Sequence, residues 1–282
     1  MGSALLFLTV YLIYPILNTA YISFLGRSSK EFAGLGNYWY VFTNADMLGA
    51  LKNNLLWLVL FTSITVSLGV AIAVLTDRVR YEAAAKALVF LPMAISFVAA
   101  SVIWRFMFEF RPAGTDQIGL MNALLSNLLG FKPVAWLVNT RVNNFALIGV
   151  GIWVWTGFCT VILSAGLKAI PVEILEAARI DGASEWRIFT SLVVPLSMPI
   201  IATLFLLAFQ FHWNNFLWQL IVTTDEKMYT VPVGLAMFRS AYEEQYALKM
   251  AASSVSIIPI AAVFLVTQRF FIEGMTKGAV KG

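Results

Sequence analysis

Charged residues are scarce in this chain of 282 residues. Asp, Glu, Lys and Arg make up 12% of it, against about 25% in a soluble domain, while 60% is hydrophobic. A soluble fold of this length needs a more charged surface, so much of this surface is expected to face hydrocarbon. The basic residues are scattered singly although the net charge is +4, so a nucleic-acid partner is not expected.

Cysteine and histidine are almost absent. One cysteine, Cys159, and one histidine, His212, exclude a disulfide framework and any metal site built from several Cys or His ligands. The chain also has no G-x-x-x-x-G-K-[ST] phosphate loop, and no carboxylates cluster at membrane depth. A membrane-embedded enzyme is therefore not expected, and no cofactor is expected on this chain.

Long apolar runs are abundant, and they have the length of helices. A bilayer core about 30 Å thick needs roughly 20 apolar residues of helix, whereas the strands of a barrel alternate over about 10. The sequence predicts an all-α polytopic membrane protein with six transmembrane helices, forming a single domain over residues 1–282. The predicted spans are Ala4–Leu25, Leu55–Leu75, Ala87–Phe108, Ala146–Leu167, Ile200–Val222 and Ala251–Phe271.

Six spans place both termini on the same side of the membrane. Lys and Arg are denser in the short segments on the side of the termini, so the positive-inside rule favours cytoplasmic termini. The first run has no basic segment before it and is interpreted as a retained helix, not a signal peptide.

The connection between the fourth and fifth spans, residues 168–199, has the sequence KAIPVEILEAARIDGASEWRIFTSLVVPLSMP. Pro171 suits the first turn of a helix and Gly182 suits a left-handed C-terminal cap, which predicts a helix over Val172–Asp181. Ser184 is expected to start a second helix that two prolines then interrupt. From these residues alone, an amphipathic connector resting on lipid headgroups explains the segment as well as a docking surface does.

This segment resembles the EAA loop of the permease subunits of ABC importers, within the carbohydrate branch. The first part of the chain is similar to one of the two permease types of such importers, above all the α-glucoside kind, and the part from Trp213 onward is similar to the other type. The residues of the loop that match are Glu176, Ala177, Ala178, Gly182 and Leu192 to Pro195. Other matching strings begin at Leu91 (LPMAISFVAASVIWRFMFE), Tyr229 (YTVPVGLAMF) and Gly274 (GMTKGAVKG).

The resemblance implies a mechanism. In that family the loop helix sits in a cleft of a cytoplasmic ATPase subunit and converts nucleotide-driven closure into movement of the spans. The ATPase-coupling role would fall here on Glu176, Ala177, Ala178, Asp181, Gly182 and Pro195. The resemblance also implies a second permease subunit, two cytoplasmic ATPase subunits that bind ATP and Mg, and an extracytoplasmic sugar-binding protein docked on the outer loops. The location implied is the prokaryotic inner membrane.

Polar residues inside the predicted spans are candidates for a sugar path, because they are costly in hydrocarbon unless they face a cavity or another helix. Amides can bond to hydroxyls and indoles can stack on sugar faces, but the same residues serve equally well as contacts between helices. His212 is expected to make an ordinary polar contact with another helix. The candidates are Gln210, Trp213, Asn214, Asn215 and Trp218, with Trp153 in the fourth span.

The alternative to a subunit of an ATP-driven sugar importer is a self-contained secondary carrier or channel. Such a protein couples to an ion gradient and needs ionisable groups buried in its spans. The charges here lie mostly at the ends of the spans, and a carrier of that kind leaves the EAA-type loop unexplained.

Overall fold

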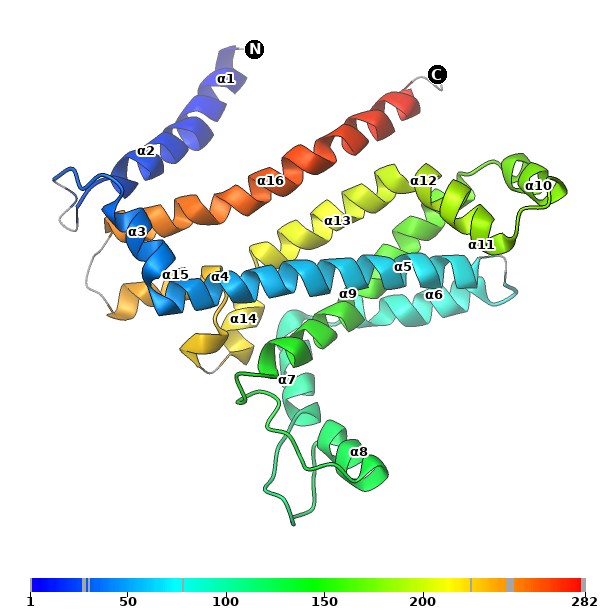
Figure 1. Cartoon of the computed structure of the whole chain (residues 1–282), viewed down its shortest axis with the longest axis horizontal. Coiled ribbons are helices and arrows are strands. Elements are labelled where there is room, and N and C mark those ends of the chain that lie inside the picture. The colour runs from blue at the N-terminus through cyan, green and yellow to red at the C-terminus, as the bar shows by residue number, and fades with distance from the viewer. Residues whose placement is uncertain are drawn as a thin grey trace. The chain divides into compact units, whose positions relative to one another are not determined.

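The computed structural model describes residues 2–26, 29, 31–77, 79–223, 225–241 and 246–279 (Figure 1). The end of the C-terminal matching string, residues 280–282, lies outside this part. The described residues are helical apart from an isolated antiparallel bridge between Leu25 and Phe32, with connecting turns. In chain order the helices are α1 (Gly2–Leu8), η1 (Thr9–Ile13), α2 (Tyr14–Ser23), α3 (Gly36–Thr43), α4 (Ala45–Trp57), η2 (Leu58–Thr62), α5 (Ser63–Thr76), α6 (Glu82–Phe90), η3 (Leu91–Ala94), α7 (Phe97–Met107), α8 (Leu120–Leu129), α9 (Asn143–Lys168), α10 (Val172–Ile180), α11 (Glu185–Ile188), η4 (Phe189–Val193), α12 (Val194–Leu196), α13 (Met198–Trp213), α14 (Leu217–Val222), η5 (Glu226–Met228), α15 (Val231–Ala241) and α16 (Tyr246–Ala279).

Four helices among the described residues are long and apolar enough to cross a membrane. They are Gly2–Ser23, Ala45–Thr76, Asn143–Lys168 and Tyr246–Arg269. Two further pairs of helices, Glu82–Ala94 with Val98–Met107 and Glu185–Leu196 with Met198–Trp213, pass the same test together, but each pair is bent by more than 40°. The prediction of an all-α polytopic protein is confirmed, with up to six spans if each bent pair is one span.

The third and fifth predicted spans are not continuous helices. The predicted span Ala87–Phe108 breaks at η3, which contains Pro92, and α7 begins anew with Ser96 as its N-cap. The predicted span Ile200–Val222 ends as a helix at Trp213 and resumes at α14. Apolar composition indicates which residues can lie in hydrocarbon, but it does not predict whether the helix there is continuous or broken.

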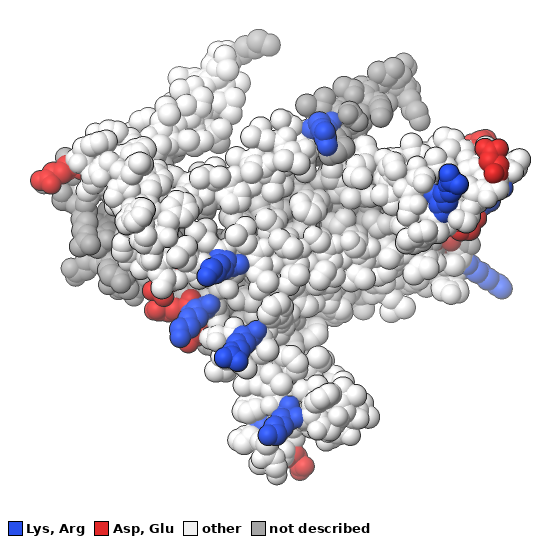
Figure 2. Space-filling model, viewed as in Figure 1, with Lys and Arg blue, Asp and Glu red and all other residues white. Residues whose placement is uncertain are grey.

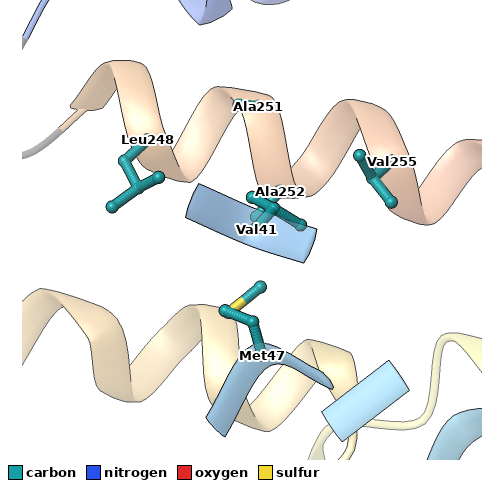
Figure 3. Close-up of a cluster of buried hydrophobic side chains, with 6 residues drawn as sticks. All are labelled: Val41, Met47, Leu248, Ala251, Ala252 and Val255. Atoms are coloured by element: carbon teal, nitrogen blue, oxygen red, sulfur yellow. The ribbon is translucent and has the colours of Figure 1, made fainter. Parts of the chain in front are cut away.

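The chain divides into two compact units, Met1–Leu55 with Asn215–Ala262 and Leu56–Asn214 with Val263–Gly282. The core of the first unit joins α3 and α4 to α16. Figure 3 shows Val41 and Met47 facing the start of α16. The cluster consists of Val41, Met47, Leu248, Ala251, Ala252 and Val255. Two adjacent alanines on α16 let the shorter helices approach closely, as small residues do between membrane helices.

The second unit is built around α9, which packs against α5, α6 and α13. Its buried cluster includes Val66, Cys159 and Leu204 from three different helices. Gly69 on α5 faces Cys159 so closely that an added Cβ would lie 2.7 Å from the cysteine Cβ. Glycine is required at this crossing because any side chain would push the two helices apart.

Candidate coupling loop and translocation site

The predicted helix–turn–helix is present between α9 and α13. Pro171 lies at the N-cap of α10, and the helix runs over Val172–Ile180 with Asp181 at its C-cap. Ser184 caps α11, because its hydroxyl accepts a hydrogen bond from the backbone N–H of Arg187 at 3.3 Å. The prediction that two short helices occupy this loop is therefore confirmed.

The turn after α10 is a Schellman motif. The N–H of Ala183 donates to the carbonyl of Ala178 at 3.0 Å, and the N–H of Gly182 donates to the carbonyl of Arg179 at 3.0 Å. Gly182 has φ +78, a left-handed conformation that glycine adopts without penalty. The predicted left-handed glycine cap is confirmed.

The second helix is interrupted between the two prolines, as predicted. Pro195 lies inside α12, Pro199 lies at the start of α13, and the bend of 67° falls at Ser197 between them. The π-helical turn η4 directly precedes α12, and a widened turn accommodates a proline ring and its missing N–H.

An ion pair holds the two helices of the loop together. Nε and Nη2 of Arg179 donate to the two carboxylate oxygens of Glu185 at 2.7 and 3.1 Å. This two-point geometry is the strong form of an Arg–carboxylate contact, and the hydrogen bonds that Arg179 donates to Glu185 raise the pKa of Arg179 above its usual range. Both side chains are exposed, so the pair orients α11 relative to α10 more than it stabilises the fold.

One face of the loop is open to solvent. Glu176, Ala177 and Asp181 are exposed, as are two large apolar side chains, Ile180 at 86% and Trp186 at 73%. Figure 2 shows charged side chains of both signs over α10 and α11, beside an uncharged stretch of α5. Exposed apolar side chains rimmed by charges are typical of a protein–protein contact surface.

A cleft of about 930 Å³ lies behind the loop, between α10–α11 and the end of α5. Val74, Leu75 and Asp77 line it from the side of α5, and Leu175 and Phe189 line it from the loop. The loop is therefore not packed down onto the end of α5.

The predicted sugar-path residues fall in both compact units. On α13, Gln210 is exposed and Trp213 is buried against Phe209, with ring centroids 5.3 Å apart. The side-chain amide of Asn214 donates to the backbone carbonyl of Gln210 at 3.1 Å. Asn215 belongs to the other compact unit.

The remaining candidates have local roles. Asn215, the residue before the N-cap of α14, accepts a hydrogen bond from the N–H of Trp218 at 3.2 Å, and Trp218 is buried within the first unit. Trp153 is 39% exposed and meets Trp104 edge-on, with centroids 5.5 Å apart. Their role in transport remains a prediction.

A buried aromatic cluster around His212 was not anticipated from the sequence. Trp57 stacks on the imidazole, with centroids 5.1 Å apart and an interplanar angle of 17°, and Phe61 and Trp155 pack around it. Gly151 leaves the space for this, because an added Cβ would lie 3.3 Å from the imidazole. Among the described residues neither ring nitrogen of His212 has a hydrogen-bond partner, so the expected polar helix contact is not found.

Asparagines fasten connecting segments within each unit, and they too were missed. Asn122 on α8 donates to the carbonyls of Glu109 and Val134 and accepts from Val134 N–H and Trp136 Nε1, at 2.9 to 3.0 Å. In the other unit, Asn53 donates to two backbone carbonyls at 2.9 Å. Their only signal in the sequence was an amide in an apolar stretch, which does not reveal its distant partners.

Residues 66–276 match the family described as "Binding-protein-dependent transport system inner membrane component". The chain belongs to this family. The resemblance to importer permeases drawn from the loop is thereby confirmed, and with its apolar helices the chain is a multi-pass membrane protein.

Individual relatives agree with this assignment. The chain is 61% identical over 193 residues to the osmoprotective compounds uptake permease protein GgtC of Synechocystis sp., covering 68% of this chain and 69% of GgtC. It is 45% identical over 202 residues to the α-glucoside transport system permease protein AglF of Rhizobium meliloti, covering 72% of this chain but only 60% of AglF. A chain in the crystal structure of a bacterial alginate ABC transporter, with an alginate pentasaccharide-bound periplasmic protein, has the same fold, with a TM-score of 0.76, 19% identity and coverage of 94% and 90%.

Proposed function

We propose that this permease carries sugar, specifically an α-glucoside or related oligosaccharide, through an importer driven by ATP hydrolysis. The observation that carries the coupling part is the exposed face of α10–α11, which presents Glu176, Ala177, Ile180 and Trp186 on a rigid turn. The substrate class is supported by the name of the relative AglF.

The proposal includes the rest of the assembly. The exposed loop face would dock a cytoplasmic ATPase subunit, with Glu176 and Asp181 meeting basic or amide groups and Ala177 allowing close approach. ATP and Mg would bind to two such ATPase subunits. A second permease would complete the path, and an extracytoplasmic binding protein would deliver sugar to the outer segments. In this arrangement the termini and the loop are cytoplasmic.

The residues suggested by the sequence remain the candidates for contact with sugar. Gln210 and Asn214 are exposed and Asn215 is half-buried, so their amides can reach sugar hydroxyls, whereas the aromatic cluster around His212 is closed by its own packing.

The experiment measures ATP hydrolysis and sugar uptake in proteoliposomes that contain the complete transporter, with and without sugar-loaded binding protein. Glu176→Ala is expected to lower both the stimulated hydrolysis and the co-purification of the ATPase subunits. Glu173→Ala, at a glutamate of the same helix that lines the cleft behind the loop, is the matched control. Sugar uptake by this chain without any ATPase would refute the proposal and favour a secondary carrier.

A further inference from the structure

Four polar side chains join the start of α6 to the last turn of α9. Glu82 and Lys86 lie one turn apart on α6, and Ser164 and Lys168 lie one turn apart on α9. Nζ of Lys168 lies 2.6 Å from Oε1 of Glu82, while Lys86 donates both to this carboxylate and to the hydroxyl of Ser164. The two helices are antiparallel at this point, and the contacts form an open ladder between them in the order Lys168, Glu82, Lys86, Ser164.

The ladder is more sheltered than an ordinary surface ion pair. The side chains of Glu82 and Lys86 are 19% and 15% exposed, and Ser164 is buried, whereas Lys168 is 54% exposed. Exposed pairs contribute little because water and salt screen them, but a sheltered carboxylate shared by two ammonium groups holds a defined geometry. Glu82 is the member that touches both cations.

A second attachment holds the other end of α6 to α9. Gly157 faces the backbone of Val89 and Phe90, and a Cβ at Gly157 would collide with both. Backbone contact at one end and the ladder at the other make α6 and α9 one rigid pair.

The position of the ladder links this pair to the coupling loop. Lys168 is the last residue of α9, and α10 begins at Val172. On its other side the loop faces the 930 Å³ cleft, which Lys168 and Asp77 also line, so the end of α5 gives the loop little support. A force applied to α10 therefore reaches the membrane helices by the end of α9, beside the route through the Arg179–Glu185 pair and α11 to α13.

We propose that Glu82 is a positioning residue for the coupling step: it ties the root of the loop to α6, so that movement of α10 is transmitted to the bent span α6–η3–α7. Without this tie the chain bends at Lys168 and the movement is lost before it reaches α6. This inference rests on the proposed function, in which the ATPase acts on α10.

The test measures moles of sugar transported per mole of ATP hydrolysed by the complete transporter in proteoliposomes. Glu82→Gln is expected to lower this ratio about fivefold or more, the size of a typical coupling free energy, while the ATPase subunits still co-purify. Glu82→Asp keeps the charge and is expected to restore most of the ratio. Arg80→Gln, at an exposed cation in the turn before α6, is the matched control and leaves the ratio unchanged.

Lys168→Gln is the second variant, because it cuts the tie at the exposed end and leaves the Glu82–Lys86 contact that supports folding. Lys168→Gln is expected to lower the ratio as Glu82→Gln does. The double variant is expected to transport no less sugar per ATP than Glu82→Gln alone, since both changes remove the same contact between Lys168 and Glu82. An unchanged ratio in Lys168→Gln, or additive losses in the double variant, overturns the inference.

The same assay separates failure of this inference from failure of the proposed function. If Glu176→Ala abolishes coupling while Glu82→Gln does not, only the role of Glu82 is refuted. If Glu176→Ala leaves both ATPase binding and the ratio intact, the proposed function fails, and the role of Glu82 fails with it.

Discussion

Gly182 is the residue where the geometry of the coupling loop depends most directly on one backbone angle. Its φ of +78 is left-handed, and the backbone of an L-residue in this region costs roughly 1–2 kcal/mol. No atom lies within 4 Å of an added Cβ at this position, so Gly182→Ala introduces the backbone cost and no collision. That cost corresponds to an about 5- to 30-fold shift of the loop away from the Schellman turn.

A graded series separates the backbone effect from side-chain volume. Asn tolerates the left-handed region and is larger than Ala, whereas Val is β-branched and strongly disfavoured there. ATPase subunits retained on co-purification with this permease are expected to fall in the order wild type, Gly182→Asn, Gly182→Ala, Gly182→Val. The thermal unfolding midpoint is expected to change little, because the turn is exposed and carries no core contact.

The order in which the Gly182 variants retain the ATPase subunits distinguishes backbone strain from side-chain volume. If Gly182→Asn loses the ATPase as completely as Gly182→Val, side-chain volume at the docking face and not φ controls binding, and the reasoning from backbone strain is refuted. Normal retention in Gly182→Val would show that the turn is not needed for docking at all.

Two other substitutions test the packing of the second unit. Gly157→Ala is expected to destabilise the protein by about 2 kcal/mol or more, because its Cβ meets the backbone of Val89, and Gly149→Ala on the same helix has open space and should leave the thermal midpoint unchanged. Asn122→Ala removes four hydrogen bonds that hold the segment around Val134 and Trp136. Disorder of this segment should weaken docking of the proposed binding protein at least about tenfold in a surface-plasmon assay. Asn139→Ala loses one exposed hydrogen bond and should bind normally. Equal affinities of the two asparagine variants would contradict the role given to Asn122.

The sequence by itself determined the features that depend on a few neighbouring residues. Scarce charge and long apolar runs predicted helices in a membrane, because the cost of burying charge acts on each segment separately. Pro171, Gly182 and Ser184 predicted the start, the turn and the restart within the coupling loop, since caps and left-handed glycines are satisfied within about six residues.

Only the tertiary structure decided which distant residues meet. Trp57 Nε1 donates to Asn144 Oδ1 at 2.9 Å across 87 positions, and Glu82 meets Lys168 between two helices, yet neither pair has a signal in the local sequence. The same holds for the burial of His212 among aromatic rings and for the break after Trp213. In a chain where most segments are apolar, hydrophobicity specifies that helices pack but not against which partner, so glycine contacts and paired polar groups fix the choice.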